Sequence, residues 1–168
     1  QLLLVAILPG LGFGMAAASL VSQSLGRNDP DDAMEWGWDV AKLATGVVGV
    51  LALVGLFFPD LLLRPFLHDA ETLALARVPL RALGASMSID TLGLVLMNAL
   101  LGAGDNLRVM VAALVLQWVL LLPVAYIIGP VLGFGMTAVW LAHIAYRILQ
   151  AGVFTLRWRS GGWVGHRV

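Results

Sequence analysis

The chain contains no cysteine and few charged residues. Its 168 residues include ten basic and ten acidic side chains, so only 12% are charged and the formal net charge is zero. The missing cysteines exclude a disulfide scaffold, a thiol nucleophile and a Cys-ligated zinc site. The balanced charge provides no basic surface that would hold nucleic acid. Soluble domains carry about 25% charged residues, so this chain, which is 60% hydrophobic, is predicted to be a polytopic protein of the lipid bilayer.

Long stretches without charge predict how often the chain crosses the membrane. A spanning helix needs about 20 mostly apolar residues. The stretch from Val109 to Tyr146 holds no Asp, Glu, Lys or Arg and is too long for one helix, so we expect a break at Gly129-Pro130 and Gly133. Residues 1–168 are therefore predicted to form a single all-α transmembrane helix bundle. Its five spans are expected at about residues 2–25, 40–59, 80–103, 109–128 and 134–156.

Two linkers carry residues that are typical of helix starts. Asp29-Pro30 combines an N-cap with a first-turn proline. Asp105 follows Gly102-x-Gly104 and is expected to cap the fourth helix. These signals support the division into spans.

Small residues are expected to pack the helices, because lipid provides no hydrophobic drive between spans. The first span has one small face, formed by Gly10, Gly14, Ala18 and Ser22. The string LGFGM at 11–15 and 132–136 also spells Gly-x-Gly-x-x-Ala. A dinucleotide fingerprint needs a strand-turn-helix unit, whereas both copies enter apolar helices, so we interpret them as packing motifs.

Basic residues divide between the two sides of the predicted bundle. The richer set is Arg27, Lys42, Arg108, Arg157, Arg159 and Arg167, and the poorer set is Arg64, Arg77 and Arg81. The richer side is expected to be cytoplasmic, with the C-terminus on it. Trp158 and Trp163 are expected to form an interfacial belt. Because Gln1 is not preceded by Met or a basic n-region, we expect the chain to be a fragment.

Asp90 is the most informative residue, because it lies about nine residues into the third predicted span. A charge near the bilayer centre costs roughly 2.5–3.5 kcal/mol on insertion scales. It persists where it faces a cavity, pairs with a cation or is protonated. Asp90 is therefore a candidate cation-coupling residue that carries H⁺ or attracts Na⁺. The structural alternative is a buried ion pair with Arg147, a residue that could instead extend its side chain to the cytoplasmic surface.

Neighbours of Asp90 on the same helix extend the candidate site. Residues at offsets of three and four share a helix face, and methionine adapts to irregular apolar ligands. This pattern suits a site for bulky, cationic or amphipathic molecules, although methionines at helical spacing are also common in ordinary packing. The candidate substrate-binding residues are Ser86, Met87 and Leu94 on or beside the Asp90 face, and Thr91 and Asn98 near its edge.

The polar residues are too isolated for an enzyme, which would need a convergent set such as paired carboxylates, a His cluster or a Ser-Lys dyad. We therefore expect no catalytic residues, no cofactor, and no metal beyond Na⁺ at Asp90.

Several stretches, taken in order, carry a family resemblance. They are GFGMAAASLVSQSLGRNDPDDA, NALLGAGDNLRVM, QWVLLLPVAYIIG, LGFGMTAVWLA and RWRSGGW. This series resembles the C-terminal part of multidrug and toxic compound extrusion (MATE) family transporters. The resemblance implies that the five spans are similar to helices eight to twelve of the family's twelve. They would form part of one lobe of a two-lobe transporter in the plasma membrane.

The resemblance also implies a function for Asp90. It stands fifteen residues before Asp105, which matches the tenth-helix acid that one branch of the family uses for cation coupling. The implied activity is secondary active antiport, in which Na⁺ or H⁺ enters while organic cations or amphipathic toxic compounds leave. The N-terminal lobe and the family's seventh-helix acid are absent from these residues, so the fragment alone is expected to be inactive.

Two alternatives remain open. A lipid-linked sugar flippase of a related superfamily would be expected to place more basic residues in its cavity than Arg147 and Arg81. A non-transporting structural membrane subunit would have no reason to retain Asp90, and the absence of a water-accessible cavity beside it would favour that interpretation.

Overall fold

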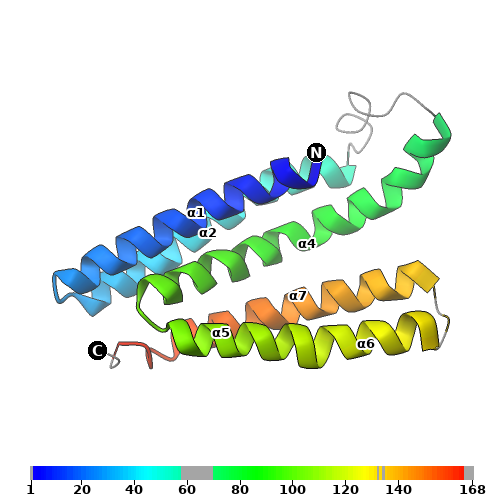
Figure 1. Cartoon of the computed structure of the whole chain (residues 1–168). Helices are drawn as coiled ribbons and strands as arrows, with labels where there is room; N and C mark the ends of the chain where they lie inside the picture. Colours follow the sequence, from blue (N-terminus) through cyan, green and yellow to red (C-terminus); the bar gives the residue numbers. More distant parts are fainter. Residues whose placement is uncertain (1, 58–69, 132, 134, 165–168) are drawn as a thin grey trace.

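The computed structural model describes residues 2–57, 70–131, 133 and 135–164, which form a bundle of long helices (Figure 1). Three of its helices are α1 (Leu2–Gly26), α2 (Pro30–Phe57) and α4 (Ala70–Gly102). A rod over 106–131 follows, and the described chain then continues into α7 (Gly135–Arg159). Helix is the only regular secondary structure in these ranges, which confirms the predicted all-α class. Residues 58 and 59 of the predicted second span lie outside the described residues, as do Arg64 and Arg167.

The 106–131 rod changes its helical pitch along its length. It consists of α5 (Asn106–Leu114), π-helical turns at Val115–Leu121, α6 (Leu122–Tyr126) and further π-helical turns at Ile127–Val131. Pro123 lies near the start of α6 and has no backbone N–H to donate. The wider π-helical turns precede that residue directly, where the regular hydrogen-bond pattern cannot continue.

Three stretches of the described chain are long and apolar enough to cross a membrane, namely Pro30–Leu53, Asn106–Gly129 and Ala138–Arg159. Ser86–Gly102 is a shorter apolar helix. The predicted spans at 2–25 and 80–103 are not among these three stretches, so they stay predictions.

Helix α4 occupies the centre of the bundle. It contacts α1 and α2, which also contact each other, while α7 packs against α4 and the 106–131 rod packs against α7 (Figure 1). The core between α1, α2 and α4 includes Val21, Ala44, Leu96 and Leu100, which are fully buried. Since α4 contacts helices from both halves of the chain, its residues hold the two halves together.

Two of the interhelical turns end their helices in the same way. The turn after α1 places Asn28 at positive φ, and its amide and that of Asp29 donate to carbonyls of the last turn. After α4, Gly104 has φ +85° and makes the equivalent bond. This is the Schellman arrangement, which favours Gly or Asn at the left-handed position.

The two predicted caps have different outcomes. The Asp32 amide donates to Asp29 Oδ1 at 3.0 Å, which confirms that Asp29 caps α2. Asp105 does begin α5, but its side chain makes no capping bond, so that part of the prediction is wrong. Its carboxylate is buried and accepts a hydrogen bond from Arg157 Nε at 2.8 Å. The partner of this carboxylate is therefore Arg157 on α7, and not the backbone amides at the start of α5.

Small residues allow the helices to approach closely, as predicted for α1. Gly10 lies against Leu94, Gly14 against Asn98, and a Cβ on Gly102 would come within 2.6 Å of the Ala18 Cα atom. These contacts confirm that three members of the predicted small face of α1 meet α4. The fourth, Ser22, is exposed and its hydroxyl donates to the Ser19 carbonyl.

The tryptophans near the C-terminus lie in the core rather than at the surface. Trp158 and Trp163 are essentially fully buried, and their rings stack at 4.4 Å between centroids. Trp163 Nε1 donates to the Trp158 carbonyl at 3.1 Å. Gly37 of α2 lies against the Trp158 ring, where a Cβ would overlap it. The prediction of an interfacial belt is therefore wrong, because the chain turns at Gly161 and folds the second ring back onto the first.

Replacing Gly93 with alanine should destabilise the intact protein. The new Cβ would lie 2.9 Å from the Ala151 Cα atom on α7, and overpacking of this kind costs about 1–3 kcal/mol. Thermal unfolding in detergent would measure the loss. Gly152→Ala is the matched control, because nothing lies within 4 Å of that position. Equal melting temperatures for the two variants would contradict the close α4–α7 contact.

Replacing Asp105 with asparagine should also lower the melting temperature. The change removes the carboxylate from Arg157 and leaves a guanidinium without its ionic partner, at a cost of about 1–3 kcal/mol. The control is Asp39→Asn, since Asp39 pairs with Lys42 on the surface and such pairs contribute below about 1 kcal/mol. A loss no larger than the control's would show that the buried pair does not tie α7 to the turn before α5.

Candidate functional site

Asp90 lies on the side of α4 that faces α7, and its carboxylate forms an ion pair. Arg147 Nε on α7 donates to Asp90 Oδ1 at 2.9 Å. The two side chains are 23% and 29% exposed, so the pair is neither sealed in the core nor fully solvated. Of the two alternatives for Arg147, the structure therefore shows the ion pair with Asp90.

A close helix contact one turn away positions this ion pair. Gly93 lies three residues after Asp90, and Ala151 lies four residues after Arg147. The missing Cβ of Gly93 lets the two backbones meet at Ala151, and α4 and α7 run in the same direction (Figure 1). Residues at offsets of three and four share a helix face, so the two charged side chains are brought within hydrogen-bonding distance.

Gln150 completes the local arrangement. Arg147 Nη1 donates to Gln150 Oε1 at 3.0 Å, so one residue three positions further along α7 fixes the orientation of the guanidinium. The sequence shows Gln150 on the same helix as Arg147 but assigns it no role. Its offset of three from Arg147 is the signal that could have identified it.

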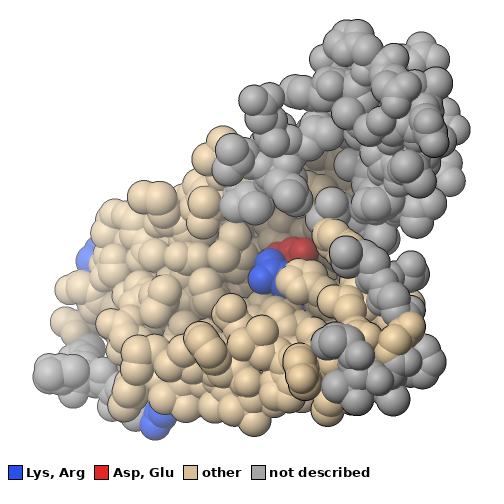
Figure 2. All heavy atoms as spheres, turned by 45° about the vertical axis from the view of Figure 1, so that its right-hand side comes forward, with Lys and Arg blue, Asp and Glu red and all other residues tan. Residues whose placement is uncertain are grey.

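Charge is scarce on the face that carries the hollow in Figure 2. Acidic atoms are seen there at one place only, where they touch basic atoms amid uncharged residues. A carboxylate and a guanidinium that neutralise each other reduce the cost of holding charge at the membrane depth predicted for Asp90. The pair is thus stable in the bundle as it stands, while part of its surface stays accessible.

The five predicted substrate-binding residues fall into two groups. Leu94 and Asn98 contact α1, because they lie against Gly10 and Gly14. Asn98 Nδ2 donates to the Leu94 carbonyl at 2.8 Å. These two side chains therefore serve the α1–α4 contact, and the structure does not turn them toward α7 with Asp90.

The other three predicted residues lie within one turn of Asp90. Thr91 is buried, and its hydroxyl donates to the Met87 carbonyl at 2.8 Å. Met87 is half-buried and Ser86 is buried. Met87 thus has accessible surface next to the turn that carries Asp90.

A cation bound at Asp90 would have one carboxylate and not an acidic cluster. Among the residues that the structure describes, no three His, Asp or Glu side chains gather to hold a metal. A hard cation such as Na⁺ can be coordinated by carbonyl and hydroxyl oxygens in addition to a carboxylate. The site therefore offers one carboxylate, which Arg147 occupies in the structure.

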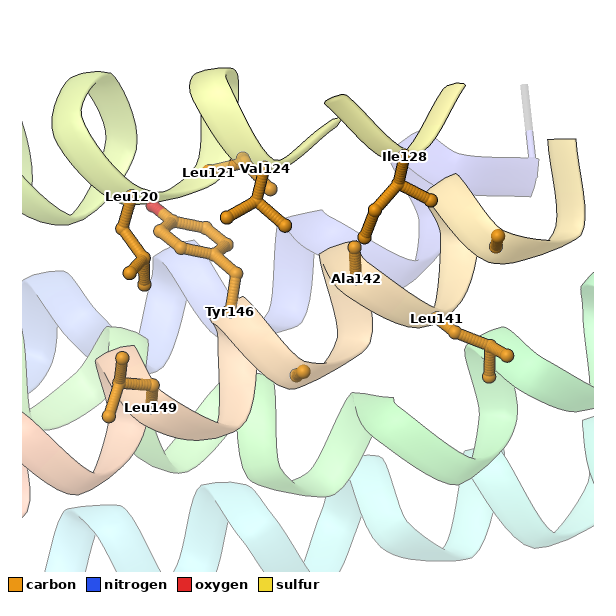
Figure 3. Close-up of a pocket in the computed structure, with 10 residues that line it drawn as sticks. Leu120, Leu121, Val124, Ile128, Leu141, Ala142, Tyr146 and Leu149 are labelled. Carbon is orange, nitrogen blue, oxygen red and sulfur yellow. The ribbon is translucent and has the colours of Figure 1, made fainter. Parts of the chain in front are cut away.

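A separate groove of about 550 Å³ runs between α7 and the 106–131 rod (Figure 3). Tyr146 and Ala142 of α7 point toward the rod across this groove, where Leu120, Val124 and Ile128 line the opposite wall. Its lining contains no charged side chain. This groove suits hydrocarbon, and Asp90 is not part of it.

Comparison with known proteins connects the chain to one family of transporters. The MatE family model matches residues 1–127. "Probable multidrug resistance protein NorM" of Bradyrhizobium diazoefficiens is 31% identical over 164 residues, which cover 95% of this chain and 35% of the relative. The protein of the same name from Thermotoga maritima is 24% identical over 162 residues, which cover 95% and 34%. "Protein DETOXIFICATION 30" of Arabidopsis thaliana is 26% identical over 146 residues, which cover 86% and 29%.

The chain spans about a third of the length of these curated relatives. No solved structure matches it. The family consists of integral membrane transporters and not of enzymes, in agreement with the apolar helices described above. Since the family model covers most of its length, the chain belongs to the MATE family of membrane transporters.

Proposed function

We propose that this chain is part of a secondary active efflux transporter in the plasma membrane. It would export organic cations or amphipathic toxic compounds in exchange for Na⁺ or H⁺. The names of the relatives, which describe multidrug resistance and detoxification, support this class of activity. The observation that carries the proposal is Asp90, the only Asp or Glu within the five predicted spans.

In the proposed mechanism, Asp90 is the cation-coupling residue. A single carboxylate can neutralise one positive charge at a time, so the coupling cation and a cationic substrate exclude each other there. If the site opens to one side of the membrane at a time, each cation that binds from one side displaces the other on the opposite side. Met87, with its flexible thioether, would contact the apolar part of the substrate.

The exchange requires a second bundle of helices. Alternating access is rocking of one bundle against another around a central site, and α1, α2, α4 and α7 are packed together as one body. We therefore propose that these helices act only together with a second lobe.

The proposed orientation places the C-terminus in the cytoplasm. The turn after α1, the turn after α4 and the end of α7 lie at the same end of the bundle (Figure 1). The basic residues Arg27, Arg108 and Arg157 belong to these segments, and basic residues favour the cytoplasmic side.

The structural features near Asp90 do not favour a flippase. Arg147 is the guanidinium bound to it, and it is already engaged by Asp90 and Gln150. A lipid-linked diphosphate would require free positive charge at the site.

Replacing Asp90 with asparagine in the full-length transporter should abolish ion-driven efflux. Asparagine keeps the shape but removes the charge that cations compete for. Efflux driven by a Na⁺ or pH gradient in proteoliposomes should fall to the background of protein-free vesicles. Asp31→Asn is the control, because Asp31 is exposed in the first turn of α2. Unchanged ion dependence in the Asp90 variant would remove its coupling role.

The proposed orientation can be tested by labelling, because the chain has no cysteine of its own. Ser160 is exposed just after α7, so Ser160→Cys should react with a membrane-impermeant maleimide in inside-out vesicles. The parent protein provides the background. Reaction in right-side-out vesicles would instead place this end of the bundle outside the cytoplasm.

A further inference from the structure

Arg147 provides Asp90 with a cation that belongs to the protein itself. Its guanidinium is charged at every physiological pH. The Nε atom donates to Asp90 Oδ1 at 2.9 Å, while Nη1 donates to Gln150 Oε1 at 3.0 Å. The carboxylate is therefore occupied in the described structure, where any external cation would have to compete for it.

We propose that Arg147 is a positioning residue that acts as a built-in competitor at Asp90. It occupies the carboxylate whenever neither the coupling cation nor a cationic substrate is bound, and each of these must displace it. This inference rests on the proposed coupling role of Asp90. It adds a third, permanent partner to the exchange and assigns that partner to α7.

The geometry of the ion pair suits repeated opening. The contact between the two groups uses one N–H and one carboxylate oxygen, and not the two parallel bonds of a bidentate pair, which are stronger. Both side chains are partly exposed, so an external cation can approach Asp90 before the pair has separated. Arg147 can keep its bond to Gln150 when it leaves the carboxylate, so its charge is never left without a hydrogen-bond acceptor.

Pairing with Arg147 also avoids an unpaired carboxylate between the release of one cation and the binding of the next. A carboxylate that has released one cation and not yet bound the next would be an uncompensated charge in the membrane. Closure of the Arg147 pair removes that state. The empty transporter can then reorient with a neutral site, whereas a bare carboxylate would have to be carried through the low-dielectric interior.

Competition lowers the apparent affinity for every cation that uses Asp90. The apparent Kd equals the intrinsic Kd divided by the fraction of molecules in which the carboxylate is available. If the pair is closed in nine molecules of ten, removal of the competitor tightens binding about tenfold. A weaker site also releases its cargo faster, which a transporter needs at the end of each cycle.

The experiment measures equilibrium binding of tetraphenylphosphonium, an organic cation whose charge does not depend on pH, to the purified full-length transporter. Arg147→Gln should bind it about tenfold more tightly than the parent protein. Arg147→Lys keeps the charge and should restore much of the weaker affinity. Gln150→Ala loosens the guanidinium and should lie between the parent and Arg147→Gln. Arg159→Gln is the matched control, because Arg159 is exposed on the same helix, and its Kd should not change.

Tighter binding after loss of a side chain is a result that structural damage does not produce. If Arg147→Gln fails to fold, Gln150→Ala still decides the matter, because a parental Kd in that variant would overturn the competitor. Asp90→Asn separates the two proposals. Should Asp90→Asn abolish binding while Arg147→Gln leaves the Kd unchanged, Arg147 is no competitor but the role of Asp90 stands. Parental binding in Asp90→Asn would defeat the proposed function itself.

Discussion

The bundle depends on close contact between helix backbones at α4. In lipid, neighbouring helices gain little from hiding apolar side chains, so attraction must come from atoms in direct contact. Gly102 meets Ala18 of α1, and Gly93 meets Ala151 of α7. These two contacts lie on different sides of α4, which makes this helix the shared wall of both halves of the chain. The contact at Gly93 also brings the two charged groups of the candidate site together.

Two carboxylates, one on α4 and one just after it, each pair with an arginine of α7. Asp90 pairs with Arg147 within the bundle, and Asp105 pairs with Arg157 at its end. The exposures differ, since the Asp105 side chain is 4% exposed and that of Asp90 is 23% exposed. A carboxylate that is sealed in the core fixes structure, whereas a carboxylate with accessible surface can exchange partners. This difference supports the proposed coupling role of Asp90 and an anchoring role for Asp105.

Much of the fold could be predicted from the sequence, because its signals are local. The apolar composition predicts a membrane protein. Asp29-Pro30 predicts the start of α2, and the small residues of α1 predict the face that contacts α4. The errors concern side chains whose partners are far along the chain. Asp105 has the sequence context of a cap, but its partner lies 52 residues later, and the burial of Trp158 depends on Gly37 of α2.

The candidate site was predictable only in part, for the same reason. Asp90 stands out because a lone acid in an apolar span is costly. Helical spacing alone cannot decide which neighbour each face of α4 meets. By spacing, Leu94 lies beside the Asp90 face and Asn98 near its edge, but in the structure both lie against glycines of α1. Gln150 acquires its role only through the guanidinium that it holds.

The stacked tryptophans give the molecule an intrinsic optical reporter. Trp158 lies on α7, eleven residues beyond Arg147, and its ring is enclosed by Gly37 and Trp163. Indole emission depends on solvent contact and on the overlap of neighbouring rings. Any sliding or rotation of α7 that accompanies the opening of its arginine would therefore alter the emission spectrum, so the motion of this helix can be followed in unlabelled protein.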